Sequence, residues 1–157
     1  MNTSPLLAIA AATGDLRLFQ KLNLHTVVPD AVAQEIRSGG RDRLGVRELE
    51  SASWLDIQSE PVAIAPYLLN TLDRGEASVI QTALNRGITT VCIDEKAGRR
   101  VARLSQLQLT GSIGILLKAK QTGHLDSIAI TINRMQSHGI YLSQTVINFA
   151  LSQAKEN

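Results

Sequence analysis

One continuous stretch constrains the fold of this chain more than any other: DRGEASVIQTALNRGITTVCIDEKAGRR, residues 73–100. Apolar residues at helical spacing predict a helix from Gly75 to about Arg86, and Gly87 is suited to end it in the left-handed conformation. The run from Ile88 to Ile93 is β-branched and almost wholly apolar, which is typical of a central strand covered on both faces. This succession favours a parallel α/β sheet.

Two acidic residues flank this helix and strand. Asp94 follows the strand directly, and Glu76 lies in the first turn of the helix, so both could face the carboxyl edge of the sheet, where ligands collect. Two carboxylates about 5 Å apart repel by roughly 3 kcal/mol at an effective dielectric of about 20, and a cation between them would remove this cost. Structural interpretations stay open, since Asp73 and Glu76 fit a capping box and Asp94 could cap the next helix.

Strands alternate with helices through about residue 122, which favours one parallel sheet flanked by helices. We predict strands at residues 25–28, 54–57, 88–94 and 106–109. We predict further helices after Pro5, at 16–22, 31–37 and 41–51, after Pro66, and at 96–104 and 113–121, then a helical tail at 125–137 and 143–155.

The start of the chain departs from this pattern. A chain of this type is expected to begin with a hydrophobic strand, but only Met1 and Asn2 precede the first helix. Either that strand is very short, or the true start lies upstream. The length of 157 residues favours one domain, residues 1–157.

Composition excludes several classes of protein. The single cysteine, Cys92, offers neither a disulfide frame nor a cysteine metal cluster, so the cytoplasm is the expected compartment. The apolar run from Leu6 to Ala12 is far shorter than the ~20 residues of a membrane helix and follows no basic segment, so we expect neither a membrane anchor nor a signal peptide. Aromatic residues make up 3% of the chain, which argues against a base-stacking platform.

Basic residues follow the candidate acidic site without an acidic residue among them. Cations beside carboxylates suit a phosphodiester substrate cleaved with the help of a metal, although any one of these residues could simply belong to a solvated helix face. The turn at 110–114 could hold a phosphate on its amides, although a plain cap and turn fits it as well. The basic residues are Lys96, Arg99, Arg100, Arg103, Lys118 and Lys120.

Several ordered motifs together resemble the PIN-domain proteins, in particular the PIN-like branch related to VapC-type toxin ribonucleases. The resemblance implies a three-layer α/β/α sandwich around a central parallel sheet, with a helical C-terminal tail. It also implies four acidic positions at one sheet edge that bind Mg²⁺ or Mn²⁺ and hydrolyse RNA. The motifs are NTSPL at 2–6, VPDAVAQEI at 28–36, DRGEASVI at 73–80, CIDEKAGRRVA at 92–102 and LTGSIGILLKAK at 109–120.

The resemblance assigns a role to each candidate residue. The first acidic position is Asn2, which can offer a carbonyl oxygen to a hard cation but carries no charge. Ligands that are all oxygen favour Mg²⁺ or Mn²⁺ over Zn²⁺. The remaining positions are Glu35, Glu76 and Asp94 as catalytic and metal-binding residues, Glu95, Thr110 and Ser112 as auxiliary residues, and Arg99, Arg100 and Arg103 as partners of substrate phosphates.

The sequence therefore favours a metal-dependent endoribonuclease, the toxin component of a toxin–antitoxin pair. One alternative is a catalytically degenerate PIN-like binding or regulatory module, which the uncharged Asn2 favours. Another is a small-molecule or phospho-acceptor protein on a flavodoxin-like sheet, which would need acids at the end of a first strand. Expected partners are RNA, an antitoxin protein and a second copy of the chain. The dimer is expected from apolar faces on the last two helices, at Ile128, Ile132, Met135, Val146, Ile147 and Ala150.

Overall fold

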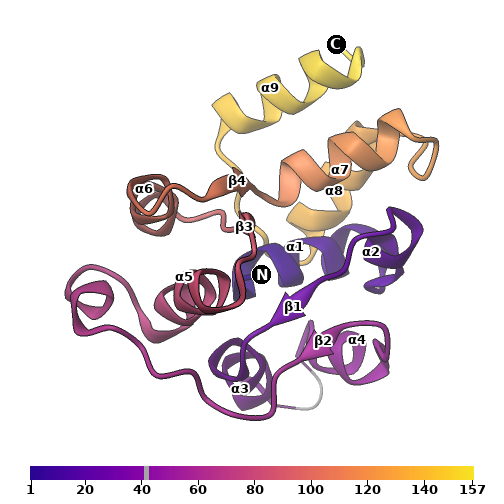
Figure 1. Ribbon diagram of the computed structural model, residues 1–157. Coiled ribbons are helices and arrows are strands. Elements are labelled where there is room, and N and C mark those ends of the chain that lie inside the picture. The colour runs from indigo at the N-terminus through magenta and orange to yellow at the C-terminus, as the bar shows by residue number, and fades with distance from the viewer. Residues whose placement is uncertain (41–42) are drawn as a thin grey trace.

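Short parallel strands surrounded by helices form an α/β scaffold (Figure 1). The computed structural model describes residues 1–40 and 43–157. The helices are α1 (Thr3–Thr13), α2 (Arg17–Lys21), α3 (Asp30–Ser38), α4 (Val46–Ser51), the 3-10 helix η1 (Pro66–Asn70), α5 (Arg74–Arg86), α6 (Lys96–Leu104), α7 (Ser112–Gln121), α8 (Ile128–Ser137) and α9 (Gln144–Ala154). The strands are β1 (Val27–Val28), β2 (Asp56–Ile57), β3 (Thr90–Cys92) and β4 (Gln108–Thr110).

The strands form two separate sheets of two strands each. β1 pairs with β2, and β3 pairs with β4, both in parallel, so the predicted strand direction is confirmed. The prediction of one sheet with four strands is wrong, because no ladder joins β1 to β3. The strands are also shorter than predicted; Trp54, for example, lies outside β2 and donates its indole N–H to the Leu16 carbonyl at 3.1 Å.

The first two residues bridge the two sheets. The Met1 ammonium donates to the Val27 carbonyl of β1 at 2.8 Å, and the Asn2 N–H donates to the Cys92 carbonyl of β3 at 3.0 Å. In Figure 1 the N-terminus accordingly lies between β1 and β3. A strand placed between the two sheets would thus end at Met1 and Asn2.

Helix α1 lies at the centre of the core. It is rich in alanine and apolar on nearly every side, and seven of its residues are buried, from Pro5 to Ala12. Such a helix must be covered all round, and α1 packs against α3, α7 and α8. This packing fixes the start of α1, and therefore Asn2, relative to the neighbouring elements.

The predicted helices are largely present. Helix α5 starts one residue before the predicted start, and Gly87 ends it with a left-handed φ of 65°. Part of the helix predicted at 41–51 is α4, while residues 41–42 lie outside the described part of the chain. No described helix is long and apolar enough to cross a membrane.

The apolar faces of α8 and α9 serve the chain's own core. Ile128, Ile132, Met135 and Ala150 are each at most 3% exposed within the single chain. These four side chains therefore offer no free surface to a second copy, whereas Val146 and Ile147 are half-buried, and the dimer stays a prediction.

Candidate functional site

The starts of α1, α5 and α6 meet beside α3, and an oxygen-rich group of side chains lies where they meet. Asn2 is the residue just before α1 and is 3% exposed. Its side-chain amide donates from Nδ2 to Glu95 Oε2 at 3.0 Å. Its other atom, Oδ1, is buried without a hydrogen-bond partner. A buried oxygen that lacks a donor is costly, so it is a candidate for a ligand.

The two carboxylate oxygens of Glu76 have different surroundings. Oε2 accepts the Asp73 N–H at 3.3 Å while the Asp73 carboxylate accepts the Glu76 N–H at 2.8 Å, so the expected capping box is present. Oε1 is buried without a partner, and the residue is 5% exposed. The structural and functional interpretations of Glu76 are therefore compatible.

Burial and neighbouring charge act on Glu76 in the same direction. Loss of hydration raises the pKa of its carboxyl, the Asp73 charge raises it further, and Glu95 adds to the effect, while the hydrogen bond from the Asp73 amide and the nearby dipole of the Gly98 amide oppose it. A cation beside Oε1 would favour the ionised form.

Two glycines let the backbone approach these oxygens closely. A Cβ atom on Gly75 would lie 3.0 Å from Glu35 Oε2 and 3.3 Å from Asn2 Oδ1. It would also lie 3.3 Å from Asp73 Oδ1, and a Cβ atom on Gly98 would lie 2.8 Å from Glu76 Oε1. We call the group of oxygens around these two glycines, from Asn2, Glu35 and Asp73 at Gly75 and from Glu76 at Gly98, the Gly75 cradle.

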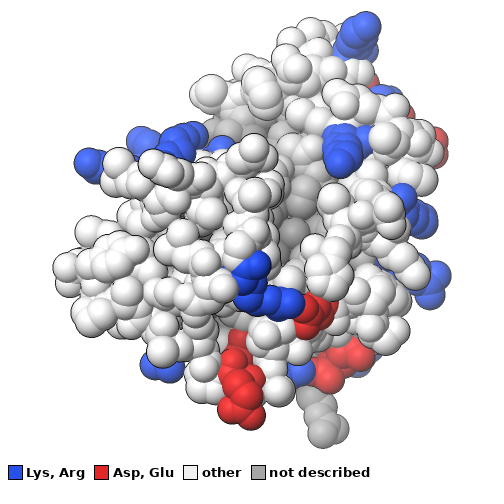
Figure 2. Space-filling view, viewed as in Figure 1, with Lys and Arg blue, Asp and Glu red and all other residues white. Residues whose placement is uncertain are grey.

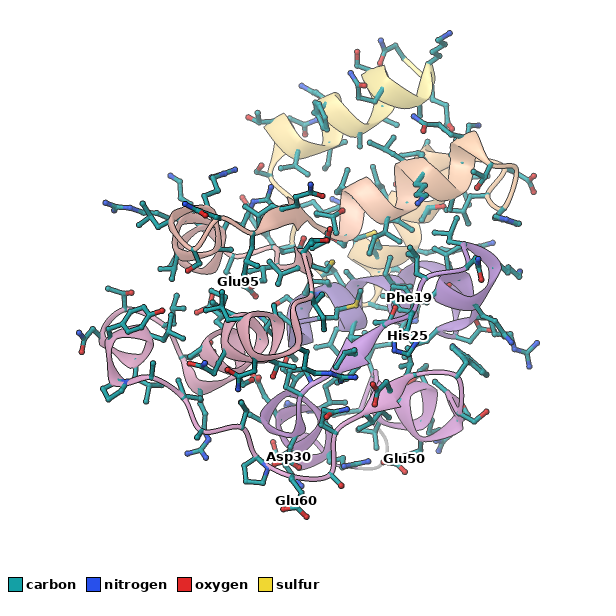
Figure 3. The ribbon with its side chains drawn as sticks, viewed as in Figure 1. Phe19, His25, Asp30, Glu50, Glu60 and Glu95 are labelled. Carbon is teal, nitrogen blue, oxygen red and sulfur yellow. The ribbon has the colours of Figure 1, made fainter. Side chains whose placement is uncertain are left out.

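Hydroxyl groups from the first turn of α1 hold two of the carboxylates. Thr3 Oγ1 donates to Glu35 Oε2 at 2.7 Å, and Ser4 Oγ donates to Glu95 Oε1. Figure 3 shows Glu95 at the start of α6, where α6 follows β3. Sequence reasoning did not single out Thr3 and Ser4 as partners of these carboxylates, and it missed the close approach of Gly75 and Gly98.

Asp94 belongs to a different group of contacts. Its Oδ1 accepts the Ser112 N–H at 2.8 Å, at the start of α7, and a Cβ atom on Gly111 would lie 2.5 Å from the same oxygen. Although the residue lies at the surface, loss of hydration of its carboxyl raises the pKa, and the Ser112 hydrogen bonds oppose this. Ser112 is thus a partner of Asp94, whereas the hydrogen bonds of Glu76 lead to Asp73 and not to Asp94.

The three arginines of α6 differ in their freedom. Arg99 donates from one guanidinium nitrogen to the Ile93 carbonyl at 2.8 Å and to the Thr110 carbonyl at 3.2 Å, so it joins the ends of β3 and β4. Arg100 and Arg103 are exposed. Figure 2 shows basic atoms gathered over α6, at the left of the view.

Comparison with known protein families finds a match over nearly the whole chain. A family model described as a PIN domain matches residues 1–156. The chain belongs to the PIN-domain family. No curated protein and no solved structure matches the chain. PIN domains have a nuclease-type fold and generally use divalent metal ions.

The donors fit a hard cation in kind. Every candidate atom is a carboxylate or amide oxygen, which Mg²⁺ and Mn²⁺ prefer, and two of the atoms are buried without donors. Within the described residues, no three acidic, His or Cys side chains are already arranged around one point as metal ligands. The Glu35 side chain is exposed and can rotate, so it is the group that would complete the set at the Gly75 cradle.

Proposed function

We propose that this PIN-domain protein is a metal-dependent endoribonuclease that holds Mg²⁺ or Mn²⁺ with Asn2, Glu35 and Glu76. One observation carries the proposal: Asn2 Oδ1 and Glu76 Oε1 are buried without hydrogen-bond donors, and each lies against a glycine at which a side chain would crowd it. A divalent cation would satisfy both atoms and neutralise the charge of Glu76.

Other residues of the chain would bind the substrate and handle the proton. The bound ion would supply Lewis acidity and lower the pKa of a bound water. Glu95, fixed by Asn2 and Ser4, can accept a proton or hold a water beside the ion. Arg100 and Arg103 can pair with substrate phosphates along the exposed side of α6.

A cavity of about 480 Å³ adjoins this acidic group and would admit the substrate. Asp94, Glu95 and Ser112 line its polar side, with Ser4 at the start of α1. Asp94, the fourth acidic position, would therefore act from the substrate side of the site, where its carboxylate can accept hydrogen bonds from a ribose or a water. Thr110 is the last residue of β4, two residues before Ser112.

Glu76→Gln tests the proposal directly. The variant keeps the shape and the capping hydrogen bond but removes the charge, so it should abolish RNA cleavage and remove most of the rise in melting temperature caused by Mn²⁺. Glu48→Gln is a matched control, because Glu48 also closes a capping box, with its Oε2 accepting the Gly45 N–H at 2.8 Å on α4. Equal loss in both variants, or cleavage retained in Glu76→Gln, would refute the assignment.

The second candidate function is a binding or regulatory module without nuclease activity. The uncharged Asn2 and the contact of Asp94 with Ser112 favour it. Asn2→Asp separates the two functions, because a restored carboxylate should strengthen Mn²⁺ binding and speed cleavage in a nuclease. Absence of cleavage in both the natural protein and Asn2→Asp would establish the binding module.

The biological setting is proposed on family resemblance alone. We propose a VapC-type toxin that consists of one domain with an α/β/α sandwich fold. It acts on cytoplasmic RNA, pairs with an antitoxin and forms a homodimer. Growth arrest on expression, absent in Glu76→Gln, would support the toxin. Light scattering that gives a monomer at tens of micromolar would count against the dimer.

A further inference from the structure

The cavity of about 480 Å³ beside Asp94 has two kinds of lining. One part is polar, with the carboxylates of Asp94 and Glu95 and the hydroxyl groups of serines. Most of the rest is apolar and comes from three helices and from the connector between α8 and α9. The apolar residues are Leu7 and Ala8 of α1, Ile113 of α7, Ile140 and Leu142 of the connector, and Val146 of α9. A ligand with apolar faces and a polar edge matches such a cavity.

The charges of the lining exclude a phosphate group. Asp94 and Glu95 both line the cavity, and no described Lys or Arg residue does. A phosphate placed inside would therefore meet two like charges. The cavity suits the uncharged part of a nucleotide, its base, while the phosphates stay outside, where Arg100 and Arg103 are exposed on α6.

The two carboxylates differ in what they can still accept. Glu95 already accepts on both oxygens, from Asn2 Nδ2 at 3.0 Å and from the Ser4 hydroxyl. Among the described residues, Asp94 accepts hydrogen bonds from Ser112 alone. A carboxylate has about four positions for hydrogen bonds, so Asp94 is the group with acceptors left for a ligand. Its two oxygens can receive two adjacent N–H donors at once.

The connector between α8 and α9 carries donors to the same cavity (Figure 1). The Ile140 N–H donates to the Met135 carbonyl at 3.0 Å, and Ser143 caps α9, so the connector is fixed at both ends. Within the described chain, the backbone N–H groups of Tyr141 and Leu142 make no backbone hydrogen bond. These amides can donate to an acceptor atom of a ligand.

Tyr141 is the aromatic residue of this lining. It is 87% exposed, so its ring is open to contact from outside the chain. Every nucleobase can stack on such a ring. The scarcity of aromatic residues argues against an extended stacking platform, but one ring is sufficient for one base. Because stacking does not distinguish bases, the choice among them falls to the hydrogen bonds of Asp94.

We propose that the cavity binds one guanine base of single-stranded RNA, stacked on Tyr141 and held at its edge by Asp94. Guanine presents two adjacent donors, its ring N1–H and its amino group, which match the two oxygens of one carboxylate. Its O6 atom accepts from the amides of the connector. Adenine, cytosine and uracil would each place an acceptor against Asp94, and such edges are read in unpaired RNA.

This inference rests on the proposed nuclease function, because Glu95 belongs to both sites. Glu95 lines the cavity and also accepts the side-chain amide of Asn2, a proposed ligand of the ion. A guanosine in the cavity would therefore place its phosphodiester next to the ion. The cavity would then decide which phosphodiester is cleaved.

Fluorescence anisotropy in EDTA tests recognition of the base without cleavage. The probes are labelled pentamers U-U-X-U-U, in which X is guanosine, adenosine or inosine, a guanosine analogue without the amino group. The guanosine pentamer should bind roughly tenfold more tightly than the other two. In Asp94→Asn, which has one acceptor oxygen in place of two, its advantage over inosine should fall below about twofold. Equal binding of the three pentamers, no binding, or an unchanged preference in Asp94→Asn would overturn the proposal.

Tyr141→Ala tests the stacking. The variant should bind the guanosine pentamer roughly fivefold more weakly or worse, whereas Tyr141→Phe keeps the ring and should bind like the natural protein. Tyr67→Ala is the matched control, because Tyr67 is 59% exposed on η1 and lies outside the lining of this cavity. No loss in Tyr141→Ala, or an equal loss in Tyr67→Ala, would overturn the stacking on Tyr141.

Mapping of cleavage in Mn²⁺ separates this proposal from the nuclease proposal. On an RNA of mixed sequence, the cuts should lie next to guanosines, and the preference should decrease in Asp94→Asn. Cuts without a preference for guanosine would overturn the base site and leave the nuclease intact. Selective binding of the guanosine pentamer without any cleavage would refute the nuclease and support a guanine site in a binding module.

Discussion

At the scale of single residues, the site depends on what small groups leave open. Gly75 lies in the first turn of α5 without a left-handed φ, so its backbone does not require glycine. What requires glycine is the space beside three oxygens. The absence of a side chain at this position is therefore part of the proposed ion site, just as the carboxylates are.

We expect Gly75→Ala to fold and to lose the ion. Its methyl group would lie 3.0 Å from Glu35 Oε2 and 3.3 Å from Asn2 Oδ1, filling the Gly75 cradle. Alanine favours the helix by about 1 kcal/mol, which offsets much of the crowding. The Mn²⁺ concentration needed for half of the thermal shift should rise at least tenfold.

Gly114→Ala provides the control for this substitution. It introduces the same methyl group in α7, where the Cβ atom would meet only the Thr110 hydroxyl, at 2.8 Å. The Mn²⁺ response of this variant should match that of the natural protein. An unchanged response in Gly75→Ala as well would show that the cradle holds no ion.

At the scale of elements, the end of the chain fastens α8 and α9 to the body. The Glu156 carboxylate accepts the N–H groups of Ile128 and Ala129 at 2.8 and 2.9 Å, and it also accepts the Ser127 hydroxyl. Lys120 of α7 pairs with it at 2.9 Å. The backbone hydrogen bond from Ala129 leads the effects that lower the pKa of Glu156 to about 2.

Glu156→Ala should therefore destabilise the protein in a pH-dependent way. Loss of a helix cap costs about 1–2 kcal/mol, which corresponds to roughly 3–6 °C in Tm for a chain of this length. A carboxyl whose pKa is lower in the folded state stabilises fully above its ordinary value of 4.5 and loses that effect as pH falls toward 2. Thermal melts should show the difference from the natural protein shrinking over that range, while Glu60→Ala, at an exposed site, should change little.

Local sequence signals predicted the individual helices and strands better than they predicted the contacts between them. The capping box at Asp73 and the left-handed Gly87 depend on neighbours a few residues away, so both could be read from the sequence. The split between β1 and β3 could not, because strand pairing depends on groups far apart in the chain. The direction of Asp94 is set in the same way, by the Ser112 amide 18 residues later.

At the scale of the whole molecule, the acidic site lowers the stability of the metal-free protein. Loss of hydration raises the pKa of both Glu76 and Asp94 above their ordinary values of 4.5 and 3.8. An acid whose pKa is higher in the folded state takes up a proton on folding, so its contribution declines as pH rises from the unfolded pKa through the folded pKa. This is opposite to the contribution of Glu156, and the three carboxylates together shape the acid side of the stability curve.

Mn²⁺ should reverse the contribution of Glu76. The ion binds the ionised carboxylate, so its stabilising effect should grow as pH rises above the ordinary value of 4.5 and reach about 2.7 kcal/mol at a concentration of 100 times Kd. Melts in EDTA and in Mn²⁺ across this range measure the difference. Glu76→Gln should flatten it, whereas Asp94→Asn, whose carboxyl is held by Ser112 on the substrate side, should retain most of it while cleavage falls. A Mn²⁺ effect that is lost in Asp94→Asn but kept in Glu76→Gln would move the ion from the Gly75 cradle to the cavity beside α7.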